Sequence, residues 1–253
     1  MKTCCVENPI TVMKRREMKY LLNEEQTAFV RKCLEGHMKE DEFGKTSIQS
    51  LYYDTPDYRL IRYSLEHPAF KEKMRLRSYG LATENSPVFL ELKRKAKHIV
   101  YKRRIQCTVG AAKQFFAGKA DAFPEGQISR EIAVFRDYYQ ELRPACMIIY
   151  DRIAYYEPGG SLRLTIDENP RYRMDGLDLT KSLRGELLLP RGWTILEIKI
   201  QDAMPIWLAD ILDKGKIYKC SFSKYGEAYK RECVKAYQLK EAMKCSVPYI
   251  QHQ

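Results

Sequence analysis

Basic residues alternate with apolar residues along the segment FKEKMRLRSY at residues 70–79. Four cations occupy every second position: Lys71, Lys73, Arg75 and Arg77. In a β-strand, side chains with this spacing share one face, and Met74 and Leu76 then lie on the other. The segment therefore predicts a strand with one apolar face and one strongly cationic face.

The same alternation recurs along the chain. Charged or polar side chains two residues apart are Glu17 and Lys19; Glu91, Lys93 and Lys95; Lys102 and Arg104; Tyr150 and Arg152; Arg163, Thr165 and Asp167; and Glu197 and Lys199. Apolar residues separate them, so six or seven strands each have one charged and one apolar face. Arg and Lys dominate the charged faces, whereas acids occur singly among them.

Two arrangements fit these strands. In the first, an open antiparallel sheet exposes its charged face to water, and cross-strand ion pairs add only about 0.2–1 kcal/mol each. In the second, the sheet closes with its charged faces inward. Because uncompensated buried charges cost several kcal/mol each, such an interior must stay wet and bind an anion. The prevalence of cations favours the second arrangement, a closed antiparallel β-barrel of about eight strands with helices packed outside.

Helical spacing separates several of the strands. Helices are expected over residues 23–38, 55–66, 111–116, 129–142, 204–214 and 221–238, and residues 171–190 are expected to form a loop with a short strand. Asn23 followed by Gln26 is typical of a capped helix start. The fold class is therefore α+β. One domain over residues 12–238 is expected, with a loose leader at 1–11 and a polar tail at 239–253.

Charge and composition limit the function. The 253 residues include 44 Lys and Arg against 33 Asp and Glu, a net charge of +11, which favours polyanionic partners. The eight cysteines lack metal-ligand spacing, which predicts reduced thiols and a cytoplasmic protein. No stretch approaches the roughly 20 apolar residues that span a bilayer, and no P-loop or dinucleotide-binding motif is present.

An ordered set of short motifs resembles a known family. The motifs are RREMKY, SLYYDT, KMRLRSYG, FLELKRK, YKRR, YDRIAYY, RLTIDEN, ILEIKI and SKYGEAY, and together they extend over roughly residues 12–230. They resemble the polyphosphate polymerase domain of the vacuolar transporter chaperone (VTC), which belongs to the triphosphate tunnel metalloenzyme superfamily. The resemblance implies a Lys/Arg-lined tunnel that transfers the γ-phosphate of ATP to a growing polyphosphate chain with Mn²⁺ or Mg²⁺.

The resemblance also implies roles for individual residues. Catalytic residues would be Lys19, Arg75, Arg77, Lys93, Arg152, Arg163 and Glu197, and further phosphate or nucleotide contacts would come from Lys102, Arg104, Tyr150 and Lys224. The metal would be held by Glu197 with Glu17 or Asp167, since hard cations prefer oxygen ligands. From the residues themselves, Lys71 and Lys73 are expected to be solvated near a strand end, and Glu91 to form a structural salt bridge.

Three alternatives remain open besides the polymerase. One is a tunnel triphosphatase, in which water is the acceptor, but the superfamily motif E-x-E-x-K has Arg15 in place of its first acid here. Another is a non-catalytic module that binds polyphosphate or nucleotide. A nucleic-acid binder is the least expected. The absence of the sensing domain and membrane helices of the eukaryotic complexes favours a stand-alone prokaryotic form, which could still reach the membrane through a partner protein.

Overall fold

The computed structural model describes residues 16–96, 99–119, 123–201 and 203–245. Its strands are β1 (Arg16–Leu22), β2 (Lys39–Glu40), β3 (Thr46–Asp54), β4 (Phe70–Tyr79), β5 (Pro87–Ala96), β6 (Ile99–Thr108), β7 (Arg143–Tyr156), β8 (Arg163–Arg173), β9 (Glu186–Leu187), β10 (Thr194–Ile200) and β11 (Lys219–Cys220). Its helices are α1 (Glu24–Leu34), α2 (Arg59–Leu65), α3 (Val109–Phe116), α4 (Gln127–Tyr139), α5 (Ile206–Lys214) and α6 (Lys224–Cys245).

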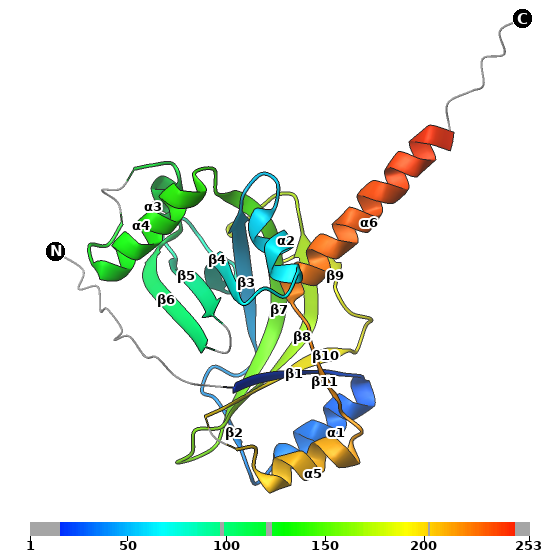
Figure 1. The fold of residues 1–253 in the computed structure, drawn as a ribbon. Coiled ribbons are helices and arrows are strands. Elements are labelled where there is room, and N and C mark those ends of the chain that lie inside the picture. The colour runs from blue at the N-terminus through cyan, green and yellow to red at the C-terminus, as the bar shows by residue number, and fades with distance from the viewer. Residues whose placement is uncertain (1–15, 97–98, 120–122, 202, 246–253) are drawn as a thin grey trace, which may run out of the picture.

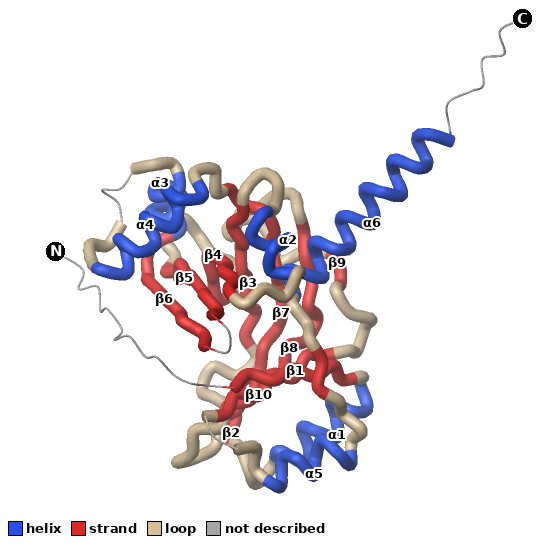
Figure 2. The backbone as a smooth tube through the Cα atoms, viewed as in Figure 1, coloured by secondary structure: helices blue, strands red, loops and turns tan. Residues whose placement is uncertain are grey.

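All the described strands join one antiparallel sheet in the order β11-β1-β10-β8-β7-β3-β4-β5-β6, with β2 paired to β7 and β9 to β8 (Figures 1 and 2). Eight of these strands have seven or more residues, and three have only two. The α+β class and the antiparallel sheet are therefore confirmed. The strand expected within residues 171–190 is β9, and β8 extends three residues into that range.

In the described residues, the sheet is not closed by hydrogen bonds. No ladder there joins β6, at one end of the strand order, to β11 or β1 at the other end. The ends nevertheless come close together, because Lys93 Nζ of β5 lies 3.2 Å from Glu17 Oε2 of β1. The sheet is therefore strongly curled, and a side-chain ion pair bridges it where the predicted barrel would have a backbone ladder. The closed barrel itself is not confirmed.

Helices cover the apolar face of the sheet in two groups (Figure 1). Helices α3 and α4 pack on the β4–β6 end, where Met74 and Leu76 are fully buried. Helices α1 and α5 pack on β1, β10 and β8. This confirms the expected orientation of β4, with its apolar residues beneath helices and its cations on the other face.

Local sequence signals explain where two of the helices begin. The Asn23 side chain accepts a hydrogen bond from Gln26 N (2.8 Å), and the Gln26 side chain accepts one from Asn23 N (3.1 Å), so α1 starts with a capping box. Before α2, the buried carboxylate of Asp54 accepts hydrogen bonds from the backbone N–H groups of Leu60 and Ile61. These contacts fix both helices against the sheet.

Helix α6 differs from the four helices on the apolar face in its position on the sheet. Its first turns lie on the charged face, where Tyr225 and Ala228 are buried against β3 and β7, and the rest of the helix projects away from the sheet (Figure 1). It continues to Cys245, beyond the end expected at residue 238. None of the helices in the described part of the chain is both long enough and apolar enough to cross a bilayer. The expected leader lies outside the described residues.

Candidate phosphate-binding site

Strand register brings the charged side chains onto one continuous face. Lys19 of β1 lies opposite Glu197 of β10, and Arg152 of β7 lies opposite Asp167 of β8. At the other end of the sheet, Glu91 of β5 lies between Arg75 of β4 and Arg104 of β6. Directly paired residues of an antiparallel sheet point to the same side. The curl of the sheet turns this charged face inward.

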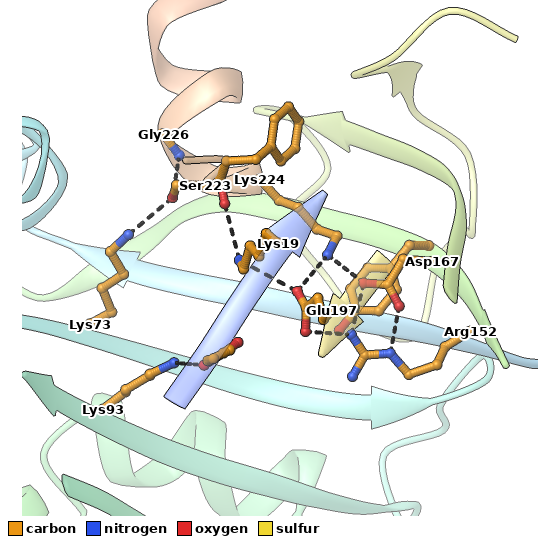
Figure 3. A network of polar contacts seen from close by, with 12 residues as sticks. Lys19, Lys73, Lys93, Arg152, Asp167, Glu197, Ser223, Lys224 and Gly226 are labelled. Atoms are coloured by element: carbon orange, nitrogen blue, oxygen red, sulfur yellow. Dashed lines mark hydrogen bonds and ion pairs between the residues drawn. The ribbon is translucent and has the colours of Figure 1, made fainter. Parts of the chain in front are cut away.

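The first centre on this face is the Glu197–Asp167 cluster, which also contains Lys19, Arg152 and Lys224 (Figure 3). Arg152 donates two hydrogen bonds to Asp167, from Nε (2.5 Å) and from Nη2 (2.7 Å), and Nη2 also reaches Glu197 Oε2 at 3.3 Å. Lys224, from the start of α6, lies between the two carboxylates. Its Nζ is 2.5 Å from Asp167 Oδ2 and 3.5 Å from Glu197 Oε1.

The cations of this cluster keep its buried acids ionised. Burial alone would raise the pKa of Glu197, but Lys224, Lys19 and Arg152 outweigh it and hold that pKa well below its usual value. The pKa of Asp167 is lowered as well, because Arg152 and Lys224 outweigh its burial. Lys224 in turn has a raised pKa, since the two carboxylates exceed the effect of its desolvation. Glu197, Asp167 and Lys224 are therefore charged near neutral pH.

The second centre is the Glu91 cluster, in which one carboxylate that is 1% exposed holds four cations. Its partners are Arg75, Arg77, Lys102 and Arg104. The closest contacts include Arg75 Nη2 to Glu91 Oε2 (2.7 Å) and Lys102 Nζ to Glu91 Oε1 (2.8 Å). These cations outweigh the effect of burial and hold the pKa of Glu91 well below its usual value.

Tyr150 connects the two clusters. Its hydroxyl accepts a hydrogen bond from Arg77 Nη2 (3.3 Å), and its ring lies beneath Lys224 Nζ and the Arg152 guanidinium. Burial would raise the pKa of Tyr150, but Arg77, Arg152 and Lys224 together lower it. A phenol with a lowered pKa in contact with three cations marks a strongly positive interior.

The face carries many more cations than acids. Its cations are Lys19, Lys71, Lys73, Arg75, Arg77, Lys93, Lys95, Lys102, Arg104, Arg152, Arg163, Lys199 and Lys224, and its acids are Glu17, Glu91, Asp167 and Glu197. Three buried polar atoms on the same face, Ser50 Oγ, Arg77 Nε and Thr165 Oγ1, have no hydrogen-bond partner among the residues that the structure describes. Unpartnered donors and excess positive charge are the features expected where an anion with many oxygen acceptors binds.

A family model described as the VTC domain matches residues 14–232. The chain belongs to the VTC domain family. No curated protein matches the chain.

One solved structure supports the fold of this VTC domain. A "putative adenylate cyclase" from Bacillus halodurans is similar with a TM-score of 0.52 and 14% identity, over 84% of this chain and 94% of that one. A second "putative adenylate cyclase", from Vibrio parahaemolyticus, gives a TM-score of 0.47 and 12% identity, over 87% of this chain and 99% of that one. At 14% identity the first likeness shows the fold alone.

Most of the residues that the sequence singled out meet in the two clusters of the VTC domain. Lys93 and Glu17 pair with each other at the junction of β5 and β1. Arg163 lies apart: it is exposed at the start of β8, its guanidinium is over the Tyr156 ring, and it donates to Leu162 O (3.1 Å). Glu91 forms the structural ion pairs expected of it, but with four cations.

One expectation about the opening segment is wrong. Lys73 is not at a strand end, because β4 begins at Phe70, and it is half-buried with its Nζ 3.1 Å from Ser223 Oγ (Figure 3). The alternation with Arg75 and Arg77 already placed Lys73 on their face. Ser223 carries no comparable signal, since it comes from the segment before α6, 150 residues along the chain.

The carboxylates of this VTC domain suit a metal only in part. Glu197, Asp167 and Glu17 offer the oxygen ligands that Mn²⁺ or Mg²⁺ prefers, but Asp167 and Glu197 already contact Lys19, Arg152 and Lys224. The described residues contain no group of three or more Asp, Glu, His or Cys side chains placed to hold a metal. Such sites often use one or two carboxylates with substrate phosphates as the remaining ligands. The donor set fits a metal that arrives with phosphate.

Proposed function

We propose that this VTC domain is an ATP-dependent polyphosphate polymerase, which transfers the γ-phosphate of ATP to the end of a polyphosphate chain. The observation that carries the proposal is the pair of carboxylate-centred clusters on one inward face, with many more cations than acids. Phosphoryl transfer needs the donor and acceptor oxygens aligned and the charge on the transferred group stabilised, and cations on a rigid sheet provide both.

The residues would divide this work by their chemistry. Arg75 and Arg152 present planar guanidinium groups that bind two phosphate oxygens at once, and they are held in place by Glu91 and Asp167. Lysines such as Lys19 and Lys102 act as point charges between neighbouring phosphates. Glu197, with Glu17 or Asp167, would hold a divalent metal, which neutralises phosphate charge when bound.

Polyphosphate synthesis tests this proposal directly. The purified protein is incubated with ATP and Mn²⁺, with and without a short polyphosphate primer, and the products are separated on a gel that resolves chain length. A ladder of lengthening chains is the expected result. Free phosphate without a ladder would instead support a tunnel triphosphatase, and binding with neither product would support a non-catalytic binding module.

Substitutions connect the activity to the site. Arg75→Ala should lower chain synthesis by about 100-fold or more, as loss of one preorganised charge-stabilising donor does in other enzymes. Arg62→Ala is the matched control, because Arg62 is exposed on α2 and pairs with Asp57. If Arg75→Ala and Glu197→Gln both left synthesis intact, the assignment of the site would be wrong.

We propose a cytoplasmic location, in which the protein uses the cellular ATP pool and reaches a membrane only through a partner. Cys33, Cys107, Cys146, Cys220 and Cys233 are free thiols, which fits a reducing compartment. Cells that produce the natural form of the protein are fractionated, and the fraction that contains the protein tests the proposed location. Recovery in the soluble cytoplasmic fraction is expected, and recovery outside the cytoplasm would contradict the proposal.

A further inference from the structure

Like charges face each other along one part of the inward face. In the β4–β5 ladder, Lys73 lies directly opposite Lys93, and Lys71 lies opposite Lys95. In the β5–β6 ladder, Lys93 lies opposite Lys102. Directly opposed like charges destabilise a sheet. One row further along, Arg75, Glu91 and Arg104 alternate in sign. The lysine rows therefore lack the internal compensation that the neighbouring row has.

Lys73 is a cation of these rows that has no carboxylate partner among the described residues. No carboxylate of the described residues lies within 4 Å of its Nζ, and its hydrogen bond is to the neutral hydroxyl of Ser223 (3.1 Å). By contrast, Lys93 pairs with Glu17 and Lys102 with Glu91. Lys73 is also half-buried, so water compensates its charge less than it does for an exposed lysine.

The groups around Lys73 come from several elements and almost all are positive. They are Lys19 of β1, Lys71 and Arg75 of β4, and Lys93 of β5, with Ser223 before α6. Glu17, an acid of this part of the face, forms an ion pair with Lys93. Burial, followed by repulsion from Lys19, Lys71 and Lys93, lowers the pKa of Lys73 to about 7.

We infer that Lys73 is a proton-linked phosphate-binding residue, which is neutral in the free protein at slightly alkaline pH and takes up a proton from solvent as a phosphate chain binds. The inference rests on the proposed function only in taking a phosphate chain as the ligand. Anionic oxygens close to an amine favour its ammonium form, as any opposite charge does. The neutral amine gains one proton, and no other bond forms or breaks.

The linkage has a definite sign. Above pH 7 the free protein holds Lys73 mostly unprotonated, whereas the complex holds it protonated, so binding consumes a proton and weakens as the pH rises. Below pH 7 the residue is already charged and binding consumes no proton there. Lys102, whose pKa burial lowers to about 8, contributes a second and smaller uptake, so Lys73 must be isolated by substitution.

Titration calorimetry tests the inference. Long-chain polyphosphate is titrated into the full-length protein at pH 8, without ATP or divalent metal, in two buffers of different ionisation enthalpy. The wild type should take up close to one proton more per protein than Lys73→Arg, because a guanidinium stays charged at this pH. Its affinity should also fall, relative to Lys73→Arg, by about tenfold between pH 8 and pH 9.

Matched variants make the result decisive. Lys73→Met should bind more weakly and also lack the extra uptake, while Lys219→Met, an exposed strand lysine opposite Tyr20 on the other face, should take up protons like the wild type. Equal proton uptake by the wild type and Lys73→Arg, with tight binding by both, would overturn the inference and leave the proposed function standing. Failure of the wild type to bind polyphosphate would overturn both.

Discussion

Tyr225 Oη donates a hydrogen bond to Asp54 Oδ2 over 2.8 Å and so connects the start of α6 to the end of β3. The same carboxylate binds the backbone of α2 through Leu60 and Ile61. The Tyr225 ring also stacks on Tyr52, with centroids 4.7 Å apart. This one tyrosine therefore holds the segment that carries Ser223 and Lys224 against the inward face.

Removal of the Tyr225 hydroxyl should weaken this attachment. Tyr225→Phe keeps the ring stack but loses the buried hydrogen bond, so the free energy of unfolding should fall by about 1–3 kcal/mol. Urea denaturation measures the change, and Tyr218→Phe, whose side chain is 78% exposed, is the control. Equal stability of the two variants would show that Asp54 does not depend on Tyr225.

Glu91→Gln should destabilise the free protein strongly. The substitution leaves four cations around a neutral buried amide, and breaking a buried ion pair costs about 3–5 kcal/mol. Polyphosphate should restore part of that loss, because its oxygens can replace the carboxylate as partner of the arginines. Thermal unfolding with and without polyphosphate measures both effects.

The control for this prediction is Glu42→Gln, an exposed acid in the loop before β3. It should change neither the unfolding temperature nor its response to polyphosphate. A larger response to the ligand in Glu91→Gln than in Glu42→Gln is the expected difference. If the ligand stabilised both variants equally, the Glu91 cluster would not be part of the binding face.

Glu197→Gln should separate binding from chemistry. The amide cannot provide the anionic ligand expected for a divalent metal, so chain synthesis with Mn²⁺ should fall by about 100-fold or more. Polyphosphate binding should be at least as tight as in the wild type, since Lys19, Lys224 and Arg152 lose a competing carboxylate. Glu186→Gln, an exposed acid on β9, is the control, and undiminished synthesis by Glu197→Gln would rule out its assigned role.

Acid should destabilise the protein partly through Asp167. Its folded-state pKa is lowered, chiefly because Arg152 and Lys224 outweigh burial, so its contribution is complete above the unfolded value of about 4 and is lost as the pH falls through the lower folded value. Asp167→Asn should therefore lose less stability than the wild type between pH 5 and pH 2. Denaturant unfolding across this range measures it, and parallel curves would contradict the assignment.

Period-two patterning was sufficient to predict the charged face and the strand faces. Met74 and Leu76 lie beneath helices as expected, and Arg75 and Arg77 lie on the opposite side with Glu91. Such patterning depends only on neighbouring residues, and so does the capping box of α1. Both could therefore be predicted from short segments of the chain.

Long-range contacts could not be predicted in the same way. The sequence gives no measure of how far the sheet curls, so it could not show that β6 and β1 have no ladder between them in the described part of the chain. Nor did the sequence predict the contact between Ser223 and Lys73, because that contact depends on how the start of α6 packs across β3 and β7. The environment of Lys73 was therefore misjudged although its side of the strand was clear.

The unpaired ends of the sheet have a consequence for a polymeric ligand. A fully hydrogen-bonded barrel would admit a long chain only by threading from a free end. Here two described side-chain contacts join the two sides: the ion pair of Lys93 with Glu17 and the hydrogen bond from Lys73 to Ser223. Both can separate without breaking any hydrogen bond of the ladders. Such separation would let a polymer enter the charged interior from the side, at any point along the polymer. The rate of entry would then not depend on the concentration of free chain ends.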